Sequence, residues 1–210
     1  MIEFIKNIKN IELYKKMKKT FLIFFLLIFH PCLFAQDISD FQIEGVSIGD
    51  SLLNYASLSK IQSTEAKFQY ANDKYSIYKF ELLKDLETYE VMNVAIKKND
   101  KNYIIQGISG IIFYKNLNNC KKIQSEIQKS VENNFNIQDK EATEFPSRQD
   151  KSGKSIIYGI QNYLKPYPSV ESIIINCYHF TEESGIDRNL KVSVNTQDYA
   201  DFIINDAYKK

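Results

Sequence analysis

Short segments in which apolar and polar residues alternate dominate the chain from residue 75 onward, and they constrain its fold more than any other feature. In the last of them, Leu190, Val192 and Val194 alternate with polar residues, which is typical of a sheet with one face in water. Six segments are predicted as strands: 75–82, 89–97, 102–114, 154–163, 169–180 and 189–195. Within each group of three, the connections are too short for the crossover that parallel strands need, so we expect an antiparallel sheet.

A period of three and four residues replaces this alternation at residues 116–135, which are therefore predicted to form a helix that lies across the sheet. A short helix capped by the Asp50 carboxylate is expected before the strands. A closing helix is expected to begin at Thr196 or Asp198. We therefore predict an α+β domain with a mainly antiparallel sheet and helices packed on one face, in the order α-βββ-α-βββ-α.

Two stretches fit this scheme less directly. Residues 136–152 are polar and long for a connection in a compact domain, so they are predicted to be a mobile or ligand-binding loop. Gly107 and Gly110 interrupt the third predicted strand. They predict a β-bulge or a close approach of the backbone, and a simple bend in the sheet is the favoured interpretation.

The N-terminus has the pattern of an export signal. Four lysines precede the apolar run 21–29, and the small residue Ala35 follows. We predict cleavage after Ala35, leaving residues 36–210 as a single globular domain in the periplasm or outside the cell. Met17 is an alternative start. An uncleaved anchor in the inner membrane is an alternative to cleavage, as is a lipoprotein acylated at Cys32.

Removal of that segment leaves two cysteines, Cys120 and Cys177, in an oxidising compartment. Cys120 shares a helical face with Ile123 and Ile127, and Cys177 alternates with apolar residues of its strand. Both thiols are expected to meet in the core, so the sequence predicts a Cys120–Cys177 disulfide. Two unbridged, buried cysteines are the alternative.

The charge distribution argues against nucleic acid as a partner. Residues 1–35 hold six Lys and two Glu, so the remainder of the chain has 21 basic and 24 acidic residues. Only two of the basic residues are arginines, Arg148 and Arg188. An acidic body with few guanidinium groups lacks the basic surface that phosphate backbones attract.

The tetrapeptide Gly49-Asp50-Ser51-Leu52 resembles the signature of the GDSL esterases and lipases, and this resemblance implies Ser51 as nucleophile and His179 as its base. His179 is the only histidine after Ala35. The family has an Asp three residues before this His, where this chain has Asn176, and its Gly-x-Asn-Asp block is absent. Its parallel sheet also differs from the fold predicted above. The favoured interpretation is a helix N-terminus, with the hydrolase as the alternative.

Gly153-Lys154-Ser155 resembles the end of a phosphate-binding P-loop. The first glycine of that motif would fall at Arg148, and the residues after Ser155 are predicted as a strand where a P-loop begins a helix. A turn that enters a strand is therefore the favoured interpretation.

Neither a metal site nor a cofactor site is predicted. Glu182, Glu183 and Asp187 lack the alternating oxygen ligands of a calcium loop, and His179 has no second ligand at a useful spacing.

Tyr163, Pro166, Tyr167 and Pro168 form a rigid aromatic corner that could stack on a sugar or a peptide. A turn between two strands, in which proline fixes the backbone, is the favoured alternative.

The run that begins Ile43-Glu-Gly-Val-Ser-Ile-Gly-Asp-Ser-Leu-Leu is similar to the opening of an uncharacterised family of small exported proteins from marine bacteria. Further matches are the segment 108–114, the Cys120 helix, the segment 150–155, Cys177-Tyr178 and the segment 190–194. Asn54 stands where the family is expected to have Asp. The resemblance covers nearly all of the predicted mature chain, but it implies no activity.

These observations predict a non-enzymatic binding or interaction domain of the cell envelope, whose partner is an envelope protein or a glycan. Membrane contact is expected only through the N-terminal export segment. The alternative is an envelope serine hydrolase that uses Ser51 and His179.

Overall fold

The structure, a computed structural model, describes residues 37–67 and 70–209. The predicted export segment, with Met17 and Cys32, lies outside the described residues. The elements are η1 (Ile38–Asp40), β1 (Gln42–Ile43), β2 (Val46–Ser47), η2 (Leu52–Asn54), α2 (Leu58–Ser63), β3 (Tyr75–Lys79), η3 (Phe80–Leu82), β4 (Val91–Lys97), β5 (Ile105–Phe113), α3 (Leu117–Asn134), β6 (Asp139–Pro146), β7 (Ile156–Tyr163), β8 (Ser172–His179), η4 (Glu182–Ser184), β9 (Asn189–Asn195) and α4 (Gln197–Asn205).

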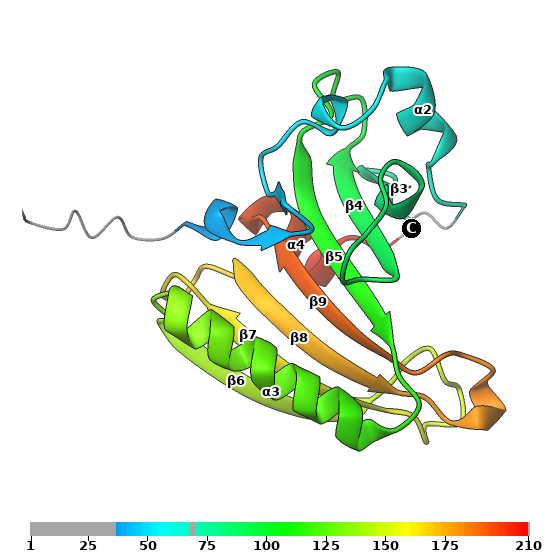
Figure 1. Cartoon of the computed structure of the whole chain (residues 1–210), viewed down its shortest axis with the longest axis vertical. Coiled ribbons are helices and arrows are strands. Elements are labelled where there is room, and N and C mark those ends of the chain that lie inside the picture. Colours follow the sequence, from blue (N-terminus) through cyan, green and yellow to red (C-terminus); the bar gives the residue numbers. More distant parts are fainter. Residues whose placement is uncertain (1–36, 68–69, 210) are drawn as a thin grey trace, which may run out of the picture. The chain divides into compact units, whose positions relative to one another are not determined.

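Strands β3 to β9 form one antiparallel sheet of seven strands in the order β3-β4-β5-β9-β8-β7-β6 (Figure 1), and β1 and β2 form a small hairpin. This arrangement confirms the predicted α+β class with a mainly antiparallel sheet. Strand β9 pairs with β5 on one side and with β8 on the other. The last strand of the chain therefore joins the two groups of strands that the sequence predicted.

The edge strand β6 corrects the prediction of a polar loop at residues 136–152. Residues Asp139–Pro146 pair along their whole length with β7. With the exception of the half-buried Thr143, they are all exposed to solvent. An edge strand without a buried face shows no alternation of apolar residues, so periodicity could not reveal it.

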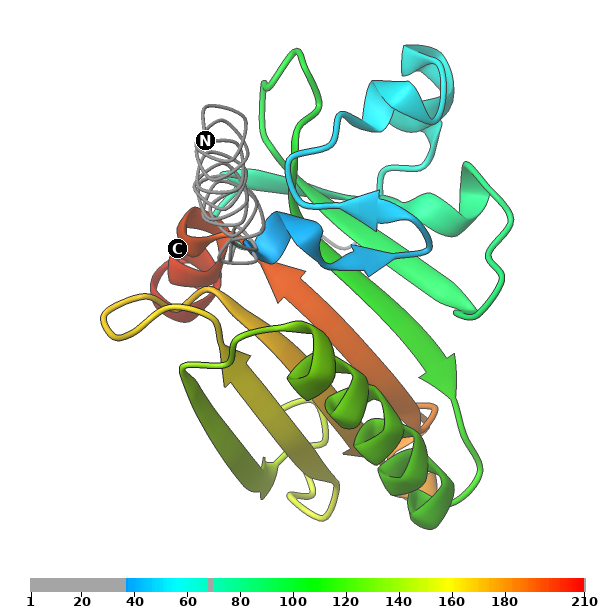
Figure 2. The same cartoon turned by 60° about the vertical axis from the view of Figure 1, so that its left-hand side comes forward.

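One face of the sheet is buried under α3 and the N-terminal elements (Figure 2). Helix α3 contributes Cys120 and Val131 to the main apolar cluster, where they pack with strand residues such as Ile175 and Val192. The β1–β2 hairpin adds Ile43 and Val46 to the same cluster. The alternation in β9 and the apolar residues at alternate positions of β8 place aliphatic side chains on this face, as the sequence predicted, although Ile174 of β8 lies on the other face.

Helix α4 lies on the opposite face, which differs from the expectation that all helices share one face. It begins where predicted, with Thr196 as its N-cap. Its Tyr199 and Phe202 pack with Tyr75 and Ala95 in a second apolar cluster. Small residues on β4 and β5 leave room there for its aromatic rings. The face that α4 covers therefore depends on residues of other strands, and the helical period of α4 itself does not indicate it.

The two glycines of β5 show a close approach of other side chains to the backbone, which the sequence favoured less than a simple bend in the sheet. A Cβ atom on Gly107 would overlap the ring of Tyr199, and one on Gly110 would overlap the ring of Tyr89. The pairing of β4 with β5 also shifts register between Ala95 and Ile96, next to Gly107. Each glycine therefore makes space for an aromatic side chain. In the described part of the chain, no helix combines the length and the apolar character that crossing a bilayer requires.

Candidate functional site

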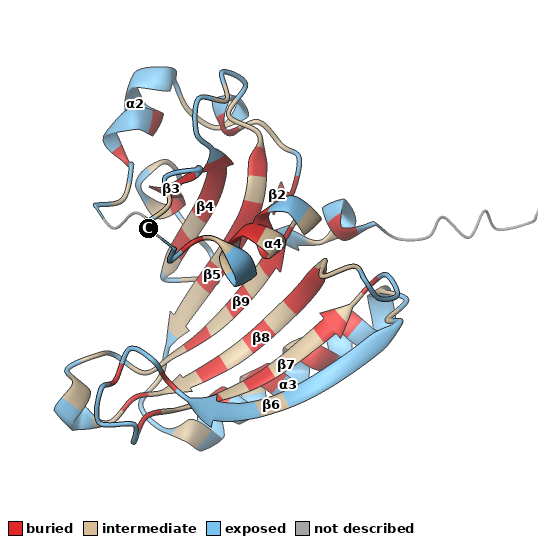
Figure 3. Cartoon of the chain, turned by 180° about the vertical axis from the view of Figure 1, so that it is seen from behind, coloured by how far each residue is buried: buried red, intermediate tan, exposed pale blue. Residues whose placement is uncertain are grey.

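A hollow of about 200 Å³ lies between α4 and the face of the sheet that α3 does not cover. Figure 3 shows this face, where α4 lies over one end and leaves much of β9, β8 and β7 uncovered. Polar and apolar residues of the central strands and of α4 line the hollow in similar measure, and its polar side chains include Asn93, Ser109, Lys191, Ser193 and Tyr199. We call the uncovered surface from this hollow to β6 the open face.

Strand alternation and register bring these side chains together. Lys191 and Ser193 alternate with the buried Leu190, Val192 and Val194 of β9, so they point away from the main core. Ser193 lies directly opposite Ser109 on β5. Ser109 in turn lies opposite Asn93 on β4. A polar row therefore runs across three neighbouring strands.

The side chains of this row and of Lys191 have no hydrogen-bond partner among the described residues. Within residues 37–67 and 70–209, the side chains of Asn93, Ser109, Lys191 and Ser193 make no hydrogen bond or ion pair. All four are half-buried. An amide, two hydroxyls and an ammonium that are partly removed from water and unpaired are suited to a polar ligand.

The wall of the hollow is formed by a pair of tyrosines. The hydroxyls of Tyr70 and Tyr199 are 2.7 Å apart and share a hydrogen bond. Burial raises the pKa of both hydroxyls above the ordinary value for tyrosine. Both side chains therefore stay neutral and form a rigid aromatic wall.

The polar surface continues from the hollow toward the β6 edge. Asn176 lies opposite Lys191 on one side and opposite Gly159 on the other. The side-chain oxygens of Asn176 and Thr143 occupy the space that a Cβ atom on Gly159 would need. The open face therefore continues across β8 and β7 with polar side chains beside apolar ones such as Ile174.

The predicted aromatic corner lies in the connection between β7 and β8, near the α4 end of the sheet. The ring of Tyr167 is 94% exposed. The loop is held to α4 through Gln197, whose side-chain oxygen accepts hydrogen bonds from Ser169 Oγ at 3.0 Å and from the Val170 amide at 2.8 Å. A turn between two strands, as favoured from the sequence, thus also presents an exposed aromatic ring.

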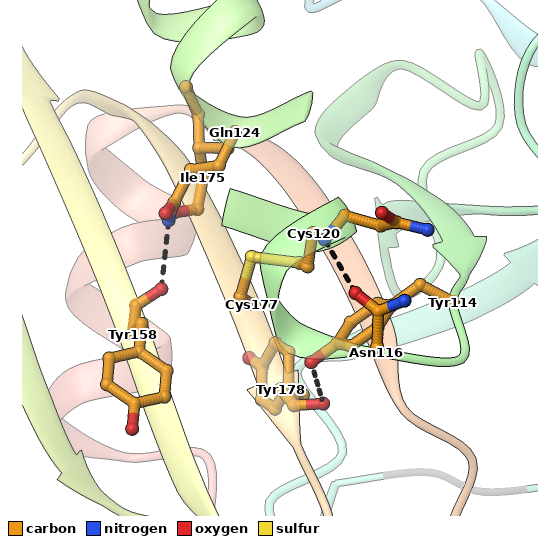
Figure 4. The surroundings of a disulfide bond; sticks show 9 residues. Tyr114, Asn116, Cys120, Gln124, Tyr158, Ile175, Cys177 and Tyr178 are labelled. Atoms are coloured by element: carbon orange, nitrogen blue, oxygen red, sulfur yellow. Dashed lines mark hydrogen bonds between the residues drawn. A yellow bond between two sulfur atoms is a disulfide. The ribbon is translucent and has the colours of Figure 1, made fainter. Parts of the chain in front are cut away.

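The predicted disulfide between Cys120 and Cys177 is present and joins α3 to β8 (Figure 4), with the two Cα atoms 6.0 Å apart. It lies on the covered face of the sheet, and both residues are fully buried. A disulfide of this kind is consistent with an oxidising, extracytoplasmic location.

Buried amides continue the contact between α3 and the sheet. The Gln124 side chain donates to the carbonyl oxygens of Tyr158 at 2.9 Å and Ile175 at 2.7 Å. One turn further along α3, Gln128 and Asn162 exchange two hydrogen bonds of 2.7 and 2.9 Å. These polar groups are paired inside the protein and are therefore structural.

The structure does not bring Ser51 and His179 together. Ser51 caps η2, where its Oγ accepts from the Leu53 amide, and the same Oγ donates to the Asn102 carbonyl at 2.5 Å. Ser51 lies beside Ile104, before the start of β5, whereas His179 ends β8 beside Ile156 at the other end of the sheet. The length of β5 separates these ends by about 25 Å. The expectation that Asp50 caps this helix is wrong, because Ser51 does so.

His179 is half-buried, and its surroundings favour the neutral imidazole. Its Nδ1 atom is shielded from solvent and has no hydrogen-bond partner in the described chain. Burial lowers its pKa, and the positive charges of Arg188 and Lys121 lower it further. Within residues 37–67 and 70–209, no carboxylate orients this histidine as a catalytic base requires.

The Asp50 carboxylate has a structural role that the sequence did not reveal. It accepts hydrogen bonds from the Ser47 amide at 2.9 Å and from the Tyr55 hydroxyl at 2.8 Å. Burial and the neighbouring Asp50 raise the pKa of Tyr55 to about 12. Asp50 therefore closes the β2–η2 turn.

Glu44 has a structural role within the Ile43–Leu53 segment. Glu44 and Gly45 both adopt positive φ, which forms the two-residue turn of the β1–β2 hairpin. The Glu44 carboxylate accepts hydrogen bonds of 2.8–3.0 Å from the amides of Glu87, Thr88 and Tyr89. Partial burial raises the pKa of Glu44, but the three amide hydrogen bonds lower it by more, so the pKa lies below its ordinary value. The motif therefore ties the N-terminal hairpin to the loop before β4.

The P-loop-like segment is likewise organised by its own carboxylate. Asp150 accepts hydrogen bonds from the side chains and the amides of Ser152 and Ser155. The hydrogen bonds from the Ser155 and Ser152 side chains, together with those from the amides, lower the pKa of Asp150 to about 2. Strand β7 begins directly after this loop, at Ile156. The predicted turn before a strand is confirmed.

Comparisons of the chain with protein-family models, with curated proteins and with solved structures find no match. The resemblance to small exported proteins of marine bacteria therefore stays a prediction. Across the part of the chain that the structure describes, no three His, Cys, Asp or Glu side chains gather in a way that could hold a metal ion.

Among the features singled out in the sequence, Gly107 and the closing helix line the hollow, and the Tyr167 corner lies near it, at the α4 end of the sheet. Sequence reasoning missed Asn93, Ser109, Lys191 and Ser193 as site residues. A signal for part of the site was present, because the polar positions of residues 189–195 predicted a wet face. The partners on β4 and β5 depend on cross-strand register, which the sequence alone did not provide.

Proposed function

We propose that the chain is a non-enzymatic binding domain of the cell envelope, and that it binds an envelope protein or a glycan through the open face of the sheet. The observation that carries this proposal is the polar row Asn93-Ser109-Ser193. Its side chains are half-buried, adjacent, and unpaired within the described residues. Polar groups left in this state next to a hollow favour the binding of a ligand that pairs with them.

The location in the envelope is supported by two independent features. The N-terminal pattern of lysines, an apolar run and Ala35 is typical of an exported protein. The disulfide between α3 and β8 is consistent with an oxidising compartment. Together they favour a periplasmic or secreted domain.

The geometry favours binding over catalysis. Ser51 is engaged as a helix cap and by Asn102, and it lies at the end of the sheet opposite to His179. The open face combines hydroxyls, an amide and an ammonium, but no carboxylate or imidazole of the described residues lines its hollow. Such a set binds and orients a polar molecule without supplying an acid–base pair.

A blocking variant tests this proposal. Ser193→Arg places a long side chain in the hollow, while Ser125→Arg makes the same change at an exposed position of α3. The full-length protein and both variants are produced with the native N-terminal segment, immobilised, and exposed to solubilised envelope material. Retained proteins and sugars are then identified and quantified.

We expect one component to be retained by the wild type and by Ser125→Arg, and to be lost with Ser193→Arg. Equal retention by all three proteins would overturn the assignment of the open face. Ester hydrolysis that Ser51→Ala abolishes would overturn the non-enzymatic proposal. Circular dichroism of each variant checks that the fold is unchanged.

A further inference from the structure

The charges around the hollow indicate the chemistry of its ligand. We propose that the open face binds an acidic saccharide, and that Lys191 binds a carboxylate of that ligand. This inference rests on the proposed function and specifies its ligand class.

The hollow carries a positive charge that no described acidic residue neutralises. Lys191 lines it and forms no ion pair with any described residue. Lys79 lies opposite Asn93 at the end of β3, on the same face of the sheet, and is likewise without an ion pair in the described chain. Among the described residues, no acidic side chain lines the hollow. The strip from Lys79 to Lys191 is therefore cationic, although residues 36–210 together carry more acidic than basic groups.

The acidic groups nearest along the fold are occupied or distant. Asp198 at the start of α4 pairs with Lys97 at 3.1 Å. Asp201 accepts a hydrogen bond of 2.8 Å from Gln197. Glu141 shares the open face but lies on β6, three strands from β9, which corresponds to about 14 Å. None of these carboxylates is in place to pair with Lys191, so an anion of the ligand can do so.

The remaining groups of the hollow match a sugar better than a peptide. The Asn93 amide and the hydroxyls of Ser109 and Ser193 each donate and accept hydrogen bonds, as the hydroxyls of a saccharide do. An extended peptide is selected instead by apolar pockets at alternate residues or by a free strand edge. The polar row lies in the interior of the sheet, on β4, β5 and β9, where every strand edge is already paired.

The exposed Tyr167 ring adds a stacking surface at the same end of the sheet. Gln197 holds its loop to the start of α4, and α4 also supplies Tyr199 to the wall of the hollow. An aromatic face stacks on the apolar face of a sugar ring, while hydroxyl groups are bound by polar side chains. A saccharide chain of a few units could therefore contact Lys191 and Tyr167.

A matched pair of ligands tests the role of charge. The probes are tri-galacturonate and its methyl ester, which has the same sugar skeleton without the carboxylates. Isothermal titration calorimetry at low ionic strength measures their dissociation constants for the full-length wild type, Lys191→Met and Lys122→Met. Methionine keeps an apolar stem of similar length but removes the charge. Lys122 is exposed on α3 and serves as the control.

We expect the wild type to bind tri-galacturonate at least about tenfold more tightly than the ester. Lys191→Met should lose this preference and leave the affinity for the ester unchanged, whereas Lys122→Met should keep it. Equal melting temperatures of the three proteins check that the fold is retained.

Three outcomes would overturn the acidic saccharide. The first is equal affinity of the wild type for both probes, and the second is binding of neither probe. The third is binding to phosphatidylglycerol vesicles without binding of either saccharide, which would identify a membrane ligand. If the ester binds to the wild type and is excluded by Ser193→Arg, the proposed function stands and only the role of Lys191 fails. The two proposals are therefore tested separately.

Discussion

The two faces of the main sheet carry similar polar side chains in different states. On the face under α3, Gln128 and Asn162 are buried and exchange two hydrogen bonds. On the open face, Asn93 and Ser193 are half-buried, and their side chains have no hydrogen-bond partner in the described chain. The residue types are alike, but the first pair is satisfied by the fold and the second set is left for another molecule. The difference shows that hydrogen bonding within the fold, more than the type of residue, distinguishes a structural polar group from a group that can bind a ligand.

Disulfide removal is expected to have the largest effect on the covered face. Cys120→Ser combined with Cys177→Ser should lower the free energy of unfolding by about 4 kcal/mol, because the unfolded chain regains the entropy of a long loop. Urea denaturation with and without reductant measures this change. Reduced wild type should unfold at nearly the same urea concentration as the double variant. Two free thiols in unfolded, unreduced wild type would contradict the prediction.

Loss of one buried amide should have the next largest effect. Gln128→Ala leaves the Asn162 side chain without its main partner, and we expect it to lower the free energy of unfolding by about 1–3 kcal/mol. Combining Gln128→Leu with Asn162→Leu removes both partners and should recover part of this loss. A single variant as stable as the wild type would show that the amide pair contributes nothing to the covered face.

The Asp150 carboxylate is also fully hydrogen-bonded within the fold, and its contribution to stability is expected to depend on pH. Its pKa is about 2 in the folded protein, against an ordinary value of 3.8. Because the folded pKa is the lower one, its stabilising contribution is present above about pH 4 and is lost as the pH falls toward 2. Asp150→Asn should therefore unfold at lower urea than the wild type at neutral pH.

The difference in unfolding midpoint between Asp150→Asn and the wild type should shrink as the pH falls from 4 to 2. Asp187→Asn is the control, because this exposed residue has no comparable set of hydrogen bonds. A difference that stays constant over this range would contradict the role of the ionised carboxylate.

Substitutions on the open face should change the free energy of unfolding least. Asn93→Ala and Ser193→Ala each remove a side chain that no described group pairs with, so the free energy of unfolding should change by no more than about 0.5 kcal/mol. Urea denaturation measures this, and binding of the envelope component should fall in parallel. A loss as large as that of Gln128→Ala would remove the contrast between the two faces.

Local sequence patterns were sufficient for most elements of the fold. The alternation at 189–195 and the helical period at 116–135 specified a strand and a helix at nearly the observed positions. The same patterns placed Cys120 and Cys177 on faces directed at one core, which predicted their disulfide. These features were predictable because burial on one face of a single element leaves a period in its own sequence.

Other features depended on contacts between distant segments. Strand β6 has no apolar period because both of its faces are in water. The side of the sheet that α4 covers is set by Gly107 and Ala95 on two other strands. The separation of Ser51 from His179 depends on the path of the whole sheet.

The candidate site shows most clearly which features follow from local sequence and which follow from contacts between distant segments. Alternation alone determined that Lys191 and Ser193 face away from the core. Only the tertiary structure decided that Asn93 and Ser109 lie beside them and that α4 closes one end of the hollow. The physical reason is that the direction of a side chain follows from its own strand, whereas its neighbours follow from the register between strands far apart in the sequence.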